Sequence, residues 1–315
     1  MVFTKTFNQI NMNSVNIAGG KGASLGEMTH AKIPVPPGYV VLSTTFEKFI
    51  ESTEGMKEEI DAVLDSVDHK ITHTVEDASE RIQSIIKNAA VPEEISTEIV
   101  KEFEKLDSTF VAVRSSATAE DSTNAAWAGQ LDTFLNTTKA NLINHVRDCW
   151  ASLFTPRAIF YRFEKELQKH KISVAVVVQK MVQSEVAGIA FSVHPVTQDR
   201  NQMIIEAGFG LGEAVVSGQI TPDSYIVDKQ DETLIDINVS EQERGMYMKK
   251  DKLGNEWVDL ALDKKGLQKL SKDQILELAK LIIKIEKHYN FPVDVEWALE
   301  KDVFYITQSR PITTL

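Results

Sequence analysis

The order of helical and strand-like patterns most constrains what this chain can fold into. Between residues 45 and 106 the sequence is charged and amphipathic, with apolar residues at helical spacing such as Ile95, Ile99 and Phe103. Runs that favour strands follow at 109–116, 131–137, 173–182, 187–196, 202–208 and 224–229, interrupted by an aromatic-rich helical pattern at 142–167. The sequence therefore predicts an α+β fold.

The last fifty residues carry the clearest local signals. Ser271 and Gln274 have the spacing of a capping box, which predicts that a helix starts there and runs to about residue 290. Two alternating runs, 293–300 and 303–311, are close enough to form a hairpin. We interpret the polar stretch 229–268 as a loose hairpin connection, and no repeat or flexible linker divides the chain.

Composition excludes several classes of function. The chain has 34 lysines and arginines against 46 acids, a net charge of −12, so it has no basic field for nucleic acid. A phosphorylated small molecule is not excluded, because it needs only a few converging cations. With Cys149 as its only cysteine, no secretory leader pattern at its start and no apolar run near the ~20 residues that span a bilayer, we expect a cytoplasmic protein that does not enter the membrane.

The terminal hairpin brings polar side chains together. A turn centred on Asp302 pairs positions whose numbers add up to 604, so Glu296 faces Gln308 and Asp294 faces Arg310. The other face is expected to carry Val293, Val295, Trp297, Tyr305 and Thr307. Carboxylate and amide oxygens suit Mg²⁺, and a nearby arginine can hold a phosphate. The alternative is an ordinary solvated face with cross-strand ion pairs.

Two further stretches have the chemistry of anion sites. "GGKGASLGEM" at 19–28 has glycines and Lys21 ahead of a helical pattern, but it is not a Walker A motif, because Val15 and Gly22 stand where that motif needs Gly and Ser or Thr. A turn with a surface lysine explains it equally. Arg114 ends an apolar run where a lone charge is costly to bury, and it needs either a ligand or an ion pair with a nearby acid.

The other motifs that we considered carry less chemistry. The glycines of 206–218 lack the GxGxxG spacing of a nicotinamide site, and they could simply allow a helix to pack closely on a sheet. The histidines show no HExxH spacing, no GxSxG elbow occurs, and His194 reads as a turn residue.

Taken together, several motifs resemble the N-terminal ATP-binding domain of phosphoenolpyruvate synthase, which also opens rifamycin phosphotransferase and, more distantly, pyruvate phosphate dikinase. They are "GGKGASLGEM", "VAVRSSATAEDSTNAAWAGQLDTFLN", "WASLFTPRAIFYR", "VVVQKMVQSEVAGIAFS", "EAGFGLGEAVVSGQITPDSY" and "FPVDVEWALE…FYITQSRPITTL". The resemblance covers almost the whole chain. It implies one ATP-grasp-like domain over 1–315, with approximate lobes 1–190 and 191–315 and the nucleotide in the cleft between them.

The resemblance also implies roles for individual residues. It assigns Lys21 and Arg114 to the ATP phosphates, Gly129 and Thr133 to a phosphate-side loop, and Gln179 to the nucleotide near its adenine. It assigns Glu296 and Gln308 to Mg²⁺ and Arg310 to a phosphate. The hairpin pairing reaches this last trio without the resemblance.

Proteins of this kind transfer the β-phosphoryl of ATP to a histidine in a TxGGxxxHxA-like motif, releasing AMP and phosphate, and then deliver it to pyruvate or rifamycin. This sequence contains neither the phosphocarrier-histidine domain nor a substrate domain. We therefore expect a phosphotransferase domain that performs the ATP half-reaction with a histidine domain in cis or in trans. The alternatives are the equivalent domain of a rifamycin phosphotransferase and a stand-alone, non-enzymatic nucleotide-binding module.

Overall fold

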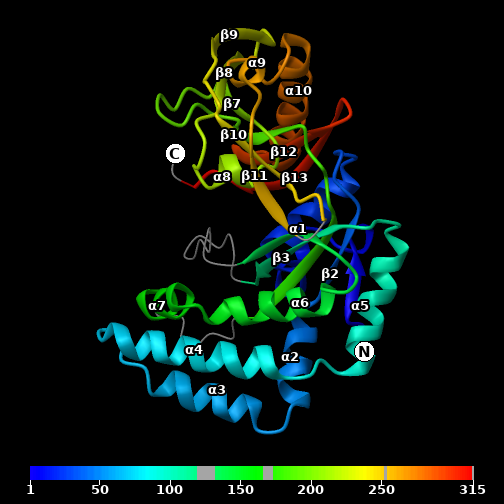
Figure 1. Cartoon of the computed structure of the whole chain (residues 1–315), viewed down its shortest axis with the longest axis vertical. Helices are drawn as coiled ribbons and strands as arrows, with labels where there is room; N and C mark the ends of the chain where they lie inside the picture. The colour runs from blue at the N-terminus through cyan, green and yellow to red at the C-terminus, as the bar shows by residue number, and fades with distance from the viewer. Residues whose placement is uncertain (119–131, 166–172, 252–253, 314–315) are drawn as a thin grey trace. The chain divides into compact units, whose positions relative to one another are not determined.

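The computed structural model describes residues 1–118, 132–165, 173–251 and 254–313. The chain folds into two compact units, and each is described by itself. The first consists of Met1–Glu27 and Pro37–Met181, and the second of Met28–Pro36 and Val182–Leu315. The predicted mixture of helices and strands is confirmed in both (Figure 1).

The first unit is built on a five-stranded antiparallel sheet with the order β1-β2-β5-β3-β4. Its strands are β1 (Thr4–Thr6), β2 (Gly38–Val41), β3 (Val111–Ala117), β4 (Thr133–Thr137) and β5 (Val174–Lys180). Its helices are α1 (Val15–His30, whose last residues belong to the second unit), α2 (Ser43–Ser52), α3 (Met56–Asp65), α4 (Thr72–Asn88), α5 (Glu93–Lys105), α6 (Leu142–Ala151) and α7 (Pro156–Glu164). Three short 3₁₀ turns cover Phe7–Gln9, Met12–Ser14 and Ser152–Phe154.

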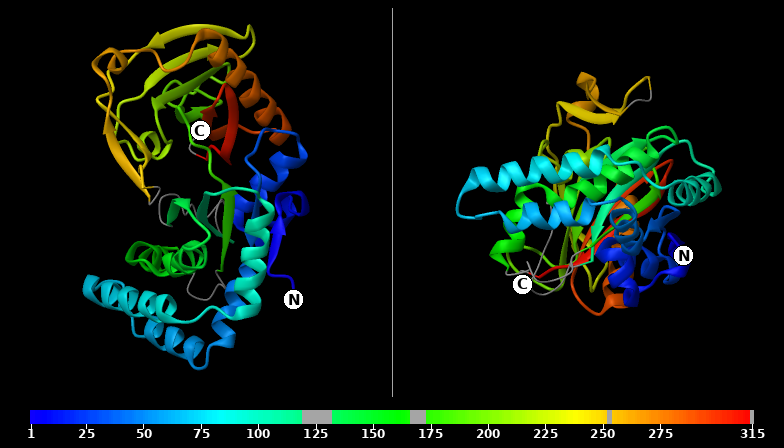
Figure 2. Two further views of the ribbon diagram at one scale, coloured as in Figure 1. Left: turned by 45° about the vertical axis from the view of Figure 1, so that its right-hand side comes forward. Right: turned by 90° about the horizontal axis from the view of Figure 1, so that it is seen from below.

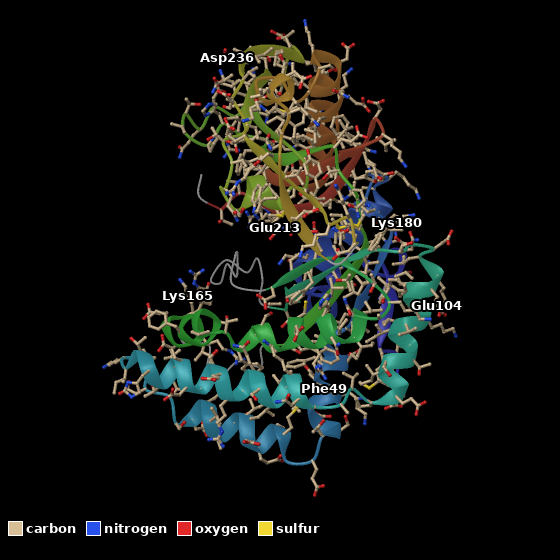
Figure 3. All side chains as sticks on the ribbon, in the orientation of Figure 1. Phe49, Glu104, Lys165, Lys180, Glu213 and Asp236 are labelled. Atoms are coloured by element: carbon tan, nitrogen blue, oxygen red, sulfur yellow. The ribbon has the colours of Figure 1, made fainter. Side chains whose placement is uncertain are left out.

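Helices cover one face of this sheet in successive layers. Helix α6 packs on β3 and β5, α4 packs on α6 and α7, and α3 packs on α4 (Figure 1). Phe49 of α2, labelled in Figure 3, stacks on Trp150 of α6 at 4.9 Å between ring centroids, and both side chains are fully buried. The predicted helical stretch from 45 to 106 is thus confirmed, because its amphipathic helices bury their apolar stripes in this core.

The second unit contains a six-stranded antiparallel sheet with the order β13-β12-β6-β7-β8-β9. Its strands are β6 (Val186–Phe191), β7 (Gln202–Phe209), β8 (Asp223–Asp228), β9 (Thr233–Asn238), β12 (Val293–Glu300) and β13 (Val303–Pro311), and a separate hairpin is formed by β10 (Arg244–Met248) and β11 (Asn255–Asp259). Its helices are α8 (Glu213–Val216), α9 (Leu262–Lys265) and α10 (Lys272–Tyr289). The predicted capping box is confirmed at Ser271 and Gln274, at the start of α10.

The interpretation of 229–268 as a loose connection is wrong. This stretch forms β9, the β10–β11 hairpin and α9. Gln242, which is 1% exposed, holds it in place by accepting from the amide N–H of Phe209 at 2.9 Å and donating to the Phe209 carbonyl at 3.0 Å. This stretch is ordered by buried polar contacts between residues far apart in the sequence, and the spacing of apolar residues does not predict such contacts.

A buried carboxylate ties the same region to β8. Asp223 Oδ1 accepts from Lys269 Nζ at 2.7 Å and from the Ser240 amide at 2.9 Å. Its Oδ2 accepts from the Tyr225 hydroxyl at 2.7 Å and from the Lys269 amide at 2.9 Å. Both side chains of the Asp223–Lys269 ion pair are 0% exposed. Each oxygen therefore has two donors, which is how a buried charge is tolerated.

No helix among the described residues is both long enough and apolar enough to cross a membrane.

Candidate functional site

A kink near the start of α1 positions Lys21. Gly19 has φ 68° and ψ 174°, so it interrupts the helix just before the lysine. A Cβ at Gly19 would lie 2.2 Å from Ser116 Oγ, which means that only glycine allows α1 to come this close to β3. The Ser116 hydroxyl donates to the Ala18 carbonyl at 2.9 Å, and Lys21 Nζ donates to the Ser115 carbonyl at 3.1 Å. Gly19 therefore allows the close packing that puts Lys21 beside β3.

Arg114, Thr133 and Gln179 lie on one face of the first sheet. Arg114 of β3 is paired with Thr133 of β4 on one side and with Val177 of β5 on the other. Gln179 is two residues along β5 from Val177, and directly paired residues in antiparallel strands share a face. Arg114 is 8% exposed and Gln179 is 2% exposed.

The opposite face of the same strands is apolar. Val111, Val113, Val176 and Val178 point into the helical core. The alternation within β3 and β5 thus separates a packing face from a polar face, and Arg114 belongs to the polar one. Gly129, which the sequence also places at this site, lies outside the described residues.

In the second unit the predicted pairing of the terminal hairpin is confirmed. Asp294 of β12 is paired with Arg310 of β13, and Glu296 is paired with Gln308. All four side chains share a face because they are paired directly and lie two residues apart. Glu296 and Gln308 therefore present a carboxylate and an amide oxygen side by side.

The prediction for the rest of the hairpin is wrong in one respect. The turn is formed by Lys301 and Asp302, both with positive φ (52° and 60°), so Glu300 pairs with Val303 and numbers there add up to 603. An irregularity next to Glu296 adds one residue to β13 and restores a total of 604. Tyr305 consequently pairs with Ala298 and lies on the face of Glu296, whereas we expected it on the face of Trp297.

Asp294 holds the Arg310 guanidinium by two bonds. Arg310 Nε and Nη2 both lie 2.7 Å from Asp294 Oδ2. Burial raises the pKa of the Asp294 carboxyl, and the charge and hydrogen bonds of Arg310 oppose that rise. The pair thus keeps one edge of the guanidinium engaged and fixes its direction. The sequence analysis paired Asp294 with Arg310, and the cross-strand ion pair that it gave as the alternative reading is present here.

The polar row continues across the sheet. Glu296 is paired with Ile189 of β6, and Ile189 is paired with Glu206 of β7, which is itself paired with Ser224 of β8. Burial raises the pKa of the Glu206 carboxyl. The sequence analysis missed Glu206, since its strand was recognised only as an apolar run and its register depends on β6.

The residues proposed for a metal offer a small ligand set. Among the described residues, no group of three or more His, Cys, Asp or Glu side chains is arranged to hold a metal ion. Glu296 and Gln308 supply two oxygen donors next to each other. Mg²⁺ characteristically binds one or two protein carboxylates and completes its coordination with water and substrate phosphates, so this donor set fits that ion.

The predicted residues thus form two groups. Lys21, Arg114 and Thr133 converge on β3 and its neighbours with Gln179, all within the first unit. Glu296, Gln308 and Arg310 converge on the hairpin of the second unit.

Comparison with known proteins gives this arrangement a context. Residues 15–315 match the family model described as "Pyruvate phosphate dikinase, AMP/ATP-binding domain". The chain is 45% identical to a probable phosphoenolpyruvate synthase of Methanocaldococcus jannaschii, over 100% of this chain and 27% of that protein. It is 40% identical to phosphoenolpyruvate synthase of Pyrococcus furiosus, over 99% of this chain and 44% of that protein.

A relative with another name is also similar. Rifampicin phosphotransferase of Bacillus subtilis is 37% identical over 98% of this chain and 35% of that protein. In each case the chain spans less than half of the relative's length, so the relatives contain other domains. Because the family model covers nearly all of the sequence, this chain belongs to the family of pyruvate phosphate dikinase AMP/ATP-binding domains, the nucleotide-binding part of phosphotransferases.

Proposed function

We propose that this chain binds ATP with Mg²⁺ and catalyses the ATP half-reaction of a phosphoenolpyruvate-synthase-type dikinase. The observation that carries the proposal is the hairpin pairing, in which a carboxylate and an amide lie beside a carboxylate-held arginine on one sheet face. That donor set is suited to a metal-bound polyphosphate. The family match supports the same ligand.

In this proposal, cations of both units serve one nucleotide. Lys21, Arg114 and Arg310 bind phosphate oxygens and act as the catalytic cations, since phosphoryl transfer depends on positioned positive charge. Gly129 contributes to a phosphate-side loop, Thr133 at the start of β4 binds on the same side, and Gln179 contacts the nucleotide near its adenine. The units 1–27 with 37–181 and 28–36 with 182–315 are then the two lobes of one ATP-grasp-like domain.

Glu296 and Gln308 would hold the metal. A bound Mg²⁺ neutralises charge that develops on the phosphates during transfer. Asp294 is a positioning residue in this scheme. Its carboxylate binds one edge of the planar Arg310 guanidinium and so fixes the orientation of the whole group.

The proposed half-reaction divides ATP into three products. ATP loses two phosphoryl groups: the β-phosphoryl forms a P–N bond with a histidine, the γ-phosphoryl passes to water as phosphate, and AMP leaves. The histidine lies on another domain or chain, in cis or in trans, and pyruvate or rifamycin is the eventual acceptor. We also propose that this takes place in the cytoplasm.

Titration calorimetry with ATP tests the proposal. Glu296→Gln should weaken ATP binding at least about tenfold in the presence of Mg²⁺ and leave metal-free binding almost unchanged, because it removes a metal ligand and not a phosphate contact. Arg114→Met should weaken binding with and without metal. Glu277→Gln, on the exposed surface of α10, is the control and should bind as the parent chain does. Absence of any ATP binding to the parent chain would refute the proposal.

Two alternatives remain distinguishable by experiment. The 37% identity to rifampicin phosphotransferase supports the equivalent domain of such an enzyme, which would transfer phosphoryl to a rifamycin together with the other domains of that enzyme. A non-enzymatic nucleotide-binding module would bind ATP but release no AMP when a phosphocarrier-histidine domain is added in trans. AMP release with that partner would support the dikinase half-reaction.

A further inference from the structure

A hollow of about 670 Å³ in the first unit lies among the helices, away from the strand residues of the proposed nucleotide site. It is lined by α2, α3 and α7 together with Phe154 and Ser173. These helices, within the layer that also contains α4, are seen from two further directions in Figure 2. Pockets of this size commonly hold small organic ligands.

The wall of the hollow is mostly apolar. Phe46 and Ile50 come from α2, Ile60 and Leu64 from α3, Phe154 from the 3₁₀ turn before α7, and Ile159 from α7 itself. Such a wall binds a hydrocarbon or aromatic body by removing it from water.

Within the described part of the chain, one partly buried arginine lies in this wall. Arg162 of α7 has its guanidinium carbon 5.6 Å from the centre of the Phe154 ring. Its Nε is buried and has no hydrogen-bond partner among the described residues. Burial lowers the pKa of the Arg162 guanidinium to about 10, so it remains protonated at neutral pH. A buried N–H donor that lacks a partner is destabilising unless a ligand satisfies it.

The rim restricts the charge of the ligand. Among the described residues, four acids, Glu47, Glu51, Asp61 and Asp65, line the hollow together with Lys57. The combined charge repels polyanions such as nucleotides, whereas a single negative charge placed on Arg162 is tolerated.

We propose that this hollow binds a monocarboxylate with an apolar body, whose carboxylate accepts hydrogen bonds from Arg162 and whose body packs on the apolar wall. The "WASLFTPRAIFYR" segment, which supplies Phe154, Ile159 and Arg162, thereby has a role separate from the nucleotide site. The site does not depend on ATP binding.

Calorimetry with octanoate, 1-octanol and octylammonium on the full chain without nucleotide tests the proposal. These probes share one alkyl body and differ in the charge of the head. Octanoate should bind with a stoichiometry of one and more tightly than the other two. If octylammonium binds as well as octanoate or better, the acidic rim and not Arg162 selects the ligand, and the proposal is wrong.

Variants separate charge from shape. Arg162→Met should weaken octanoate binding at least tenfold, leave octanol binding unchanged, and raise or preserve the Tm of the free protein, because it removes a buried N–H donor that has no partner among the described residues. Leu64→Trp should weaken both probes by filling the hollow. Arg81→Met is the control: this arginine, on α4, is paired with Glu59 in an exposed ion pair and should have no effect on octanoate. Equal octanoate affinity for the parent chain and Arg162→Met would overturn the inference.

The place of binding is checked by NMR of methyl-labelled protein. Octanoate should shift the methyl signals of Ile50, Ile60, Leu64 and Ile159. Shifts confined to other methyl groups would show that octanoate binds elsewhere, which would also overturn the inference.

Discussion

Replacing Asp223 by alanine is expected to destabilise the second unit by about 4 kcal/mol, the middle of the range for breaking a buried ion pair. The carboxylate accepts four hydrogen bonds, from Lys269 Nζ, Lys269 N, Ser240 N and the Tyr225 hydroxyl. Alanine leaves all four donors without that acceptor. It also leaves the Lys269 ammonium buried, with the Ser240 carbonyl as its remaining hydrogen-bond partner and the Phe209 ring 5.5 Å away.

Lys269→Met should cost less, about 3 kcal/mol at the lower end of the same range, because the substitution removes only the ammonium while Asp223 keeps three donors. The order of the two costs follows from which partner makes more bonds. A purely Coulombic pair would give the two substitutions similar costs.

The measurement is urea unfolding followed by hydrogen–deuterium exchange and mass spectrometry, which reports the free energy of opening for peptides of each unit separately. Peptides of β8 and α10 should show the loss, and peptides of α4 and α6 should not. Asp236→Ala is the matched control, since Asp236 on the adjacent strand β9 is exposed (Figure 3). An Asp223→Ala cost within about 1 kcal/mol of that control, the level of an ordinary surface change, would refute the reasoning, as would a larger cost for Lys269→Met.

Three other outcomes are expected. Gly188→Ala should cost about 3 kcal/mol in urea unfolding, because a Cβ there would lie 1.8 Å from the Glu206 carbonyl oxygen, whereas Gly266→Ala, with nothing within 4 Å, should cost nothing. Glu206→Gln should be more stable than the parent chain at pH 7 and equal to it below the unfolded pKa of the glutamate. The folded pKa of Glu206 is raised by burial, so the parent chain loses stability as the pH rises through it; equal melting curves at both pH values would contradict this. Cys149, fully buried with a thiol pKa raised to about 12, should react with a thiol reagent only after unfolding.

Local patterns predicted most elements of the fold because each was encoded within about ten residues. The capping box before α10 and the alternation in β12 needed no partner elsewhere in the chain. The pairing of Glu296 with Gln308 was also within reach, since the two strands are joined by a short turn.

The remainder depends on residues far apart in the sequence. Asp223 and Lys269 are 46 positions apart, and nothing near either residue indicates a buried pair. Glu206 shares a sheet face with Glu296 only because β6, which lies between their strands, pairs with both of them. The Gly19 kink was recognised as a turn signal, but the approach to Ser116 that makes glycine necessary depends on β3.

The single extra residue in β13 next to Glu296 has a consequence for how this hairpin tolerates changes in length. It works as a spacer between a tip whose pairing the turn dictates and a base where Gln308 and Arg310 must emerge on the same side as Glu296. If Thr307 were kept and β13 paired regularly from the tip, Thr307 would face Glu296, and Gln308 and Arg310 would lie on the opposite face. Loop grafts at Lys301 and Asp302 that preserve strand pairing, and deletion of the extra residue Thr307, should therefore both keep Gln308 opposite Glu296 and Arg310 opposite Asp294.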